Sequence, residues 1–149
     1  MVVLFRIMMM FAGYTAACIT ASLVLALGTL GPDWNGLFAD MGFHSAHAQS
    51  AAMWVVVGIG AAIIFAVGFL PTALVVALTE GFALRSPILY GIVGGLLAFA
   101  MAYGLDFAGY IAASSDRDVM HEREVFAAAG IAGGLVYWLF AGRRAGTYK

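Results

Sequence analysis

Four long apolar stretches, separated by short polar joins, set the pattern of hydrophobic and polar positions along this chain. They cover residues 7–30, 51–78, 87–113 and 124–141, and the charged residues gather between them. An uninterrupted apolar run of about 18 residues or more is typical of a membrane-spanning helix. The pattern therefore predicts an all-α fold: a single domain over residues 1–149, with four transmembrane helices in an antiparallel bundle.

The joins carry signals that end or begin helices, and one of them resembles a processing site. Gly31-Pro32-Asp33 ends the first stretch, and Ser86-Pro87 places a capping serine before a proline at the first helical position. Ala46-His47-Ala48 before Gln49 has the form of a signal-peptide cleavage site. However, it lies well beyond an apolar run that exceeds the roughly 7–15 residues of a signal core. We therefore expect the first stretch to remain a span.

The second stretch is longer than one membrane crossing needs, and it contains Pro71. Residues 51–70 alone make about 30 Å of helix, which is about the thickness of the hydrocarbon core. Proline removes a backbone donor and clashes with the preceding turn. Two interpretations are open: one kinked helix that continues to about Leu78, or a span that ends near Pro71 with residues 72–84 at the interface. The uniformly apolar residues just after Pro71 favour the kinked helix.

Composition and charge narrow the class of protein and its partners. Hydrophobic residues make up 64% of the chain and charged residues 10%, with a net charge of −1. Soluble domains carry about 25% charged residues, so a lipid bilayer is the expected surrounding. A net charge near zero offers no basic field for nucleic acid.

The distribution of Lys and Arg predicts the orientation, because cytoplasmic joins carry an excess of these residues. One side of a four-span protein holds Arg6, Arg85, Arg143, Arg144 and Lys149. The other side holds Arg117 and Arg123, diluted by neighbouring carboxylates. Both termini are therefore predicted to be cytoplasmic. The preference for Arg over Lys and the abundance of Ala and Gly suit a GC-rich bacterial genome, so a bacterial inner membrane is the expected location.

Small residues recur at four-residue spacing in every stretch, which places them on shared helix faces where backbones can approach closely in lipid. Cys18, Ser22 and Ala26 align in the first stretch. The predicted packing positions elsewhere are Gly58, Ala62 and Ala66 in the second stretch, Gly91 and Gly95 in the third, and Gly130 and Gly134 in the fourth. We expect most of these faces to make contacts within the chain.

A short internal echo links the third and fourth stretches. Residues 91–96, GIVGGL, resemble residues 130–135, GIAGGL. Each lies a few residues after its predicted helix start, so antiparallel helices would place the two segments in opposite leaflets. Because transporter repeats contain several helices each, chance or shared packing chemistry explains the echo better.

Two carboxylates near span ends are candidates for an ion or proton pathway, since ionisable groups in membranes are functional candidates by default. Asp106 lies about 28 Å along a helix that begins at Pro87, near the periplasmic edge of the hydrocarbon. Glu80 lies correspondingly near the cytoplasmic edge of the hydrocarbon. A solvated interfacial role is the more common alternative for both.

Histidines and carboxylates on the predicted periplasmic side form a weak candidate metal site. His44 and His47 would share one face if their loop were helical, and imidazole with carboxylate suits zinc or copper. The remaining members of this candidate site are His121, Asp118 and Glu122. Solvated loop residues are the simpler interpretation of all five.

The sequence contains no recognisable catalytic motif, so we expect no enzyme and no cofactor. The leading hypothesis is an integral membrane protein that acts through helix packing, as an accessory subunit, assembly factor or homo-oligomer with a membrane-protein partner. The alternative is a small transporter or channel, acting as an oligomer, with Asp106 and Glu80 as polar points and Pro71 as a kink.

Overall fold

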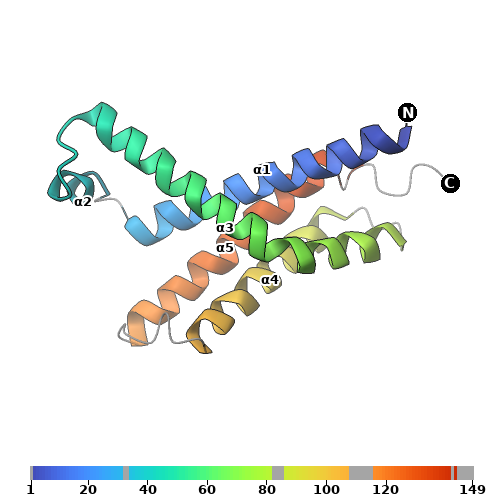
Figure 1. The fold of residues 1–149 in the computed structure, drawn as a ribbon. Coiled ribbons are helices and arrows are strands. Elements are labelled where there is room, and N and C mark those ends of the chain that lie inside the picture. The colour runs from blue at the N-terminus through green and yellow to red at the C-terminus, as the bar shows by residue number, and fades with distance from the viewer. Residues whose placement is uncertain (1, 32–33, 82–85, 108–115, 142, 144–149) are drawn as a thin grey trace.

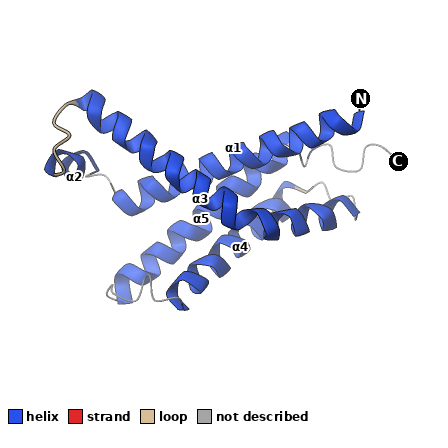
Figure 2. Cartoon of the chain, in the orientation of Figure 1, coloured by secondary structure: helices blue, strands red, loops and turns tan. Residues whose placement is uncertain are grey.

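The computed structural model describes residues 2–31, 34–81, 86–107, 116–141 and 143, and Figure 2 shows that these residues are helical apart from short connections. Within these ranges, side chains are described except at 2–3, 6, 76–81, 104–107 and 116–122. The helices are α1 (Val2–Leu30), α2 (Trp34–Asp40), α3 (Ala46–Gly81), α4 (Pro87–Phe107) and α5 (Asp116–Phe140).

The four long helices form a row in the order α3, α1, α5, α4, which we call the helix row. Helix α5 packs against both α4 and α1, and α1 packs in turn against α3. Among the described residues, α3 and α4 hardly touch although they are consecutive in sequence. The helices cross near the centre of the molecule and diverge on either side of the crossing (Figure 1). The arrangement is an open row of packed helix pairs.

Neighbouring helices in the row run in opposite directions. The start of α1 and the end of α5 lie at one end of the molecule, whereas α2 and the start of α5 lie at the opposite end (Figure 1). The consecutive long helices α1 and α3, and likewise α4 and α5, therefore pack side by side in opposite directions.

Three of the described helices contain a segment long and apolar enough to cross a membrane. These segments are Ile7–Leu30, Ala46–Val75 and Arg123–Phe140. The apolar segment described in α4, Pro87–Tyr103, is shorter. The sequence predicts four spans, and its expected third stretch runs on to residue 113, beyond the described end of α4.

Helix α3 is the longest element, with 36 residues, and Pro71 lies inside it. The helix continues through the proline to Gly81, and Figure 1 shows that it changes direction along its length. A proline inside a helix removes the hydrogen bond to the carbonyl four residues earlier, which permits such a bend. This geometry matches the kinked-helix interpretation of the second stretch.

The connection between α1 and α3 contains a short helix, α2, where the sequence predicts only a polar loop. Phe38 lies on the buried side of α2 and packs with Ala26 of α1 and with Met53 and Val57 of α3. Gly42, at a φ of 95°, ends α2, and the next amide, of Phe43, donates to the Phe38 carbonyl at 2.9 Å. This six-residue closure is the Schellman arrangement that glycine makes possible. The buried phenylalanine thus anchors the connection to the helix row.

Candidate functional site

The backbones of α4 and α5 are in contact through glycine. A Cβ atom added at Gly94 would overlap the carbonyl oxygen of Gly130, and one added at Gly130 would overlap that of Gly94. One turn away, a Cβ added at Gly134 would overlap the carbonyl oxygen of Tyr90. Because glycine has no Cβ, its presence at these positions allows the two helices to approach this closely.

The two echoed segments meet in this contact. Gly94 belongs to the first echo and Gly130 to the second, so both lie at the same depth. The prediction that the segments lie in opposite leaflets is wrong, because α5 begins at Asp116 rather than near residue 124. The second echo therefore lies in the middle of a long helix, and the shared glycine pattern serves one antiparallel contact.

Of the other small residues predicted in α4, Gly91 faces the Leu135 and Ile131 side chains, and a Cβ added at Gly95 would lie 2.8 Å from Ile131. The tightest backbone contact in α4 falls on Gly94, which the four-residue pattern does not include. The pattern therefore locates the packing face but misses its closest point.

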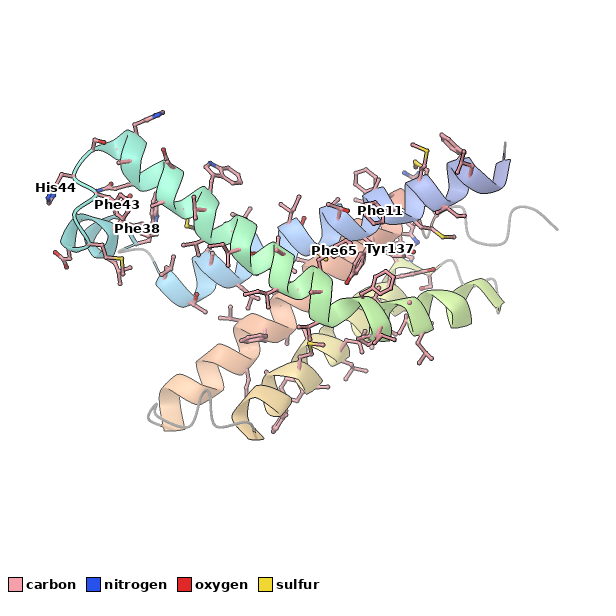
Figure 3. The ribbon with its side chains drawn as sticks, viewed as in Figure 1. Phe11, Phe38, Phe43, His44, Phe65 and Tyr137 are labelled. Atoms are coloured by element: carbon pink, nitrogen blue, oxygen red, sulfur yellow. The ribbon has the colours of Figure 1, made fainter. Side chains whose placement is uncertain are left out.

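Helices α1 and α3 are joined by side chains that reach across to the other backbone. The Ser22 hydroxyl donates to the Val57 carbonyl at 2.8 Å, and the Tyr14 hydroxyl donates to the Phe65 carbonyl at 2.9 Å. The Phe65 ring also meets the Phe11 ring edge-on, with centroids 5.7 Å apart. Figure 3 shows Phe11 and Phe65 on neighbouring helices near the crossing of α1 and α3. This pair is held by hydrogen bonds and aromatic contacts.

Small residues of α1 pack against two neighbouring helices, α3 and α5. Cys18, Ser22 and Ala26 are all buried, as their alignment on one face predicts. On the α5 side, a Cβ added at Gly133 would lie 3.2 Å from the Ala17 carbonyl oxygen and 3.4 Å from the Ala21 side chain. Helix α1 therefore occupies the interior of the helix row.

The small residues predicted to pack in α3 point away from the other helices. Gly58, Ala62 and Ala66 are exposed, and no atom lies within 4 Å of a Cβ added at Gly58. We call these three residues the outer stripe. The contacts of α3 with α1 use Val57, Gly60 and Ala61 instead, on the opposite side of the helix. The outer stripe is therefore an exposed face in the described part of the chain.

An apolar cavity of about 180 Å³ lies between the four long helices. Each helix contributes lining residues over about three turns, for example Tyr14 to Leu25 in α1 and Tyr90 to Met101 in α4. None of the described lining residues is charged. Pro71, Gly130 and Gly134, singled out in the sequence for other reasons, all lie in the wall. The cavity is partly open to its surroundings, and α3 and α4, which make few contacts in the described part of the chain, both contribute to its wall.

The polar groups of the cavity wall are already engaged within the protein. The Tyr14 hydroxyl lies beside the Cys18 thiol and the Thr72 hydroxyl, and it donates to the Phe65 carbonyl. Tyr90 and Tyr137 are buried against each other, with ring centroids 5.9 Å apart. Among the described side chains, no buried nitrogen or oxygen lacks a hydrogen-bond partner. The wall therefore presents hydrocarbon to whatever occupies the cavity.

Most of the predicted pathway and metal residues have side chains outside the described part of the structure. The backbones of Glu80 and Asp106 lie in the last turns of α3 and α4, but their side chains lie outside the described residues. The same holds for Asp118, His121 and Glu122 in the first turns of α5.

His44 and His47 are exposed at the end of the molecule that holds α2. His44 precedes α3 rather than lying in a helix with His47, and Figure 3 shows it pointing away from Phe38 and Phe43. Among the described residues, no three His, Cys, Asp or Glu side chains are close enough to hold a metal ion together.

No protein-family model, curated protein or solved structure matches this chain.

Proposed function

We propose that this chain is a small integral protein of the bacterial inner membrane, which crosses the bilayer four times with both ends in the cytoplasm. Helix α4 supports the fourth crossing, because its 21 residues make about 31 Å of helix, close to the thickness of the hydrocarbon core. Large apolar side chains are exposed on all four long helices, such as Leu70 at 80% and Ile88 at 69%. Lipid is the surrounding that such a surface suits.

Within the membrane, the proposed role is packing against another embedded chain, as an accessory subunit, assembly factor or homo-oligomer. The outer stripe of α3 carries this proposal, because its small residues share a face that no described helix covers. In lipid, association depends on close van der Waals packing, and small residues at four-residue spacing permit a second helix to approach. Helix α3 stands at one end of the helix row, where such a helix has access.

The test is purification of the full chain in mild detergent, followed by mass analysis of what travels with it. We expect a particle larger than one chain, and we expect Ala62→Phe to release the partner because the ring holds the helices apart. The matched control is Val67→Phe, which adds a ring on the same helix at an exposed position outside the outer stripe. A strictly monomeric, partner-free chain under all mild conditions would contradict the proposal.

The orientation has its own test. A reporter protein that is active only in the cytoplasm, fused after Lys149, should be active. The same reporter placed in the α2 connection should be silent. The reverse pattern would overturn the proposed orientation without bearing on the outer stripe.

A further inference from the structure

We propose that the cavity between the four long helices binds one acyl chain of a membrane lipid. The lining residues extend over about three turns, or about 16 Å, of each helix, while the volume is about 180 Å³. The space is therefore long and narrow. An α-helix with its side chains is about 10–12 Å wide, so a helix from another protein does not fit, whereas a single hydrocarbon chain does.

The chemistry of the wall selects hydrocarbon over water or a polar ligand. Apolar cavities of this size stay dry and bind apolar molecules. The described polar atoms in the wall have partners within the protein, and Tyr14 has its donor committed to Phe65. No charged residue lines the cavity, so no lipid headgroup has a counter-ion there. The occupant is therefore the tail of a lipid, with its headgroup outside the cavity.

The gap between α3 and α4 gives the tail a route into the cavity. Both helices stand at the ends of the helix row and hardly touch each other. The lining residues of these two helices are uncharged and mostly apolar, including Val75 on α3 and Val93 on α4. A tail entering from the surrounding lipid thus meets hydrocarbon throughout its path.

Binding of the tail is favoured by the van der Waals contacts that it makes with the cavity wall. Tails are as apolar as the wall, so the hydrophobic effect does not distinguish the cavity from the bilayer. An empty cavity, however, leaves its lining atoms without dispersion contacts on one side, and a chain restores them. Lipid tails are also the most abundant apolar groups around a protein in a bilayer.

Photo-crosslinking tests this proposal with the full chain in vesicles. The vesicles contain a phospholipid that carries a diazirine in the middle of one acyl chain, and crosslinked peptides are mapped by mass spectrometry. We expect adducts on cavity residues such as Leu97 and Met101, in addition to adducts on exposed positions that all membrane lipids touch. Adducts confined to exposed positions would overturn the proposal.

Two pairs of variants separate a bound tail from general lipid contact. Val93→Trp obstructs the cavity from α4 and Val75→Trp obstructs it from α3, and each should lower the cavity adducts about tenfold because the added ring occupies the path of a chain. Their controls, Ile92→Trp and Leu74→Trp, add the same ring to exposed neighbours and should leave the cavity adducts unchanged.

Circular dichroism shows which of these variants keep their helices, and one folded obstructing variant is enough for the comparison. Cavity adducts that persist in a folded obstructing variant would overturn the proposal. So would cavity peptides crosslinked to a second copy of the chain in place of lipid, since a partner chain would then occupy the space.

Discussion

The α4–α5 pair brings two backbones into contact, whereas the α1–α3 pair is joined by side chains of α1 that bond to the backbone of α3. Gly94 and Gly130 leave no room for even a methyl group between α4 and α5. Between α1 and α3, the corresponding obstacle at Gly60 is the hydroxyl of Ser22, and the contact includes two hydrogen bonds to carbonyls. Close backbone packing tolerates little change, while side-chain contacts can rearrange.

The largest expected effect breaks the backbone contact. Gly130→Ala places a methyl group against the Gly94 carbonyl and 2.6 Å from the Ala98 Cβ. Because neither group can rotate away, α4 and α5 must separate, and we expect a loss of about 2 kcal/mol in the free energy of unfolding. Titration with a denaturing detergent, followed by circular dichroism, measures this loss.

Two further glycine substitutions serve as references for that measurement. Gly60→Ala meets the Ser22 hydroxyl, which can turn away at the cost of its bond to Val57, so we expect a loss below about 1 kcal/mol. Gly58→Ala meets no described atom of its own chain, so in the chain without a partner it reports the gain in helix propensity alone. Equal losses at Gly130 and Gly60 would remove the distinction between the two pairs.

Removing the cross-helix hydrogen bonds sharpens the comparison on the α1–α3 side. Tyr14→Phe keeps the ring contacts with Phe65 but loses the bond to its carbonyl, and we expect a cost of about 0.6 kcal/mol and at most about 1.7. Thr15→Val is the control, because Thr15 bonds only to Phe11 of its own helix. If Thr15→Val lowers the free energy of unfolding as much as Tyr14→Phe does, the cross-helix hydrogen bond stabilises the fold no more than a bond within one helix.

A similarly small effect is expected at one end of the α4–α5 pair. The Arg123 guanidinium lies over the Tyr103 ring, 4.4 Å from its centroid, and Tyr103 is 47% exposed. A cation–π contact at such a site is worth about 0.5–1 kcal/mol. A double-mutant cycle with Arg123→Gln and Tyr103→Leu should give a coupling energy in this range. The cycle subtracts the other interactions of Arg123, and zero coupling would leave the glycine contact as the main link between these helices.

The apolar stretches predicted the long helices, because the length of an apolar run can be read from the local sequence without knowing its tertiary contacts. The short helix α2 escaped prediction, because seven residues with a glycine inside give a weak helical pattern. Its order comes from the burial of Phe38 among residues of α1 and α3, which only the folded chain brings together.

The small residues show what spacing alone cannot decide. Gly58, Ala62 and Ala66 share a face as predicted, but in the structure that face is exposed. In α4, Gly91, Gly94 and Gly95 offer overlapping registers, and the crossing of α4 with α5 selects Gly94 for the closest contact. The cavity and its engaged polar wall could not be anticipated, since their residues come from four helices.

The order of the helix row has a consequence for biosynthesis. Ribosomes deliver the helices from α1 to α5, and α3 and α4 emerge in succession although they hardly touch. Helix α4 finds its main neighbour only when α5 has been made, and α5 in turn docks on α1, the first helix to emerge. Assembly therefore waits for the last long helix, and a nascent chain that ends before residue 116 leaves α4 without its main partner in the row.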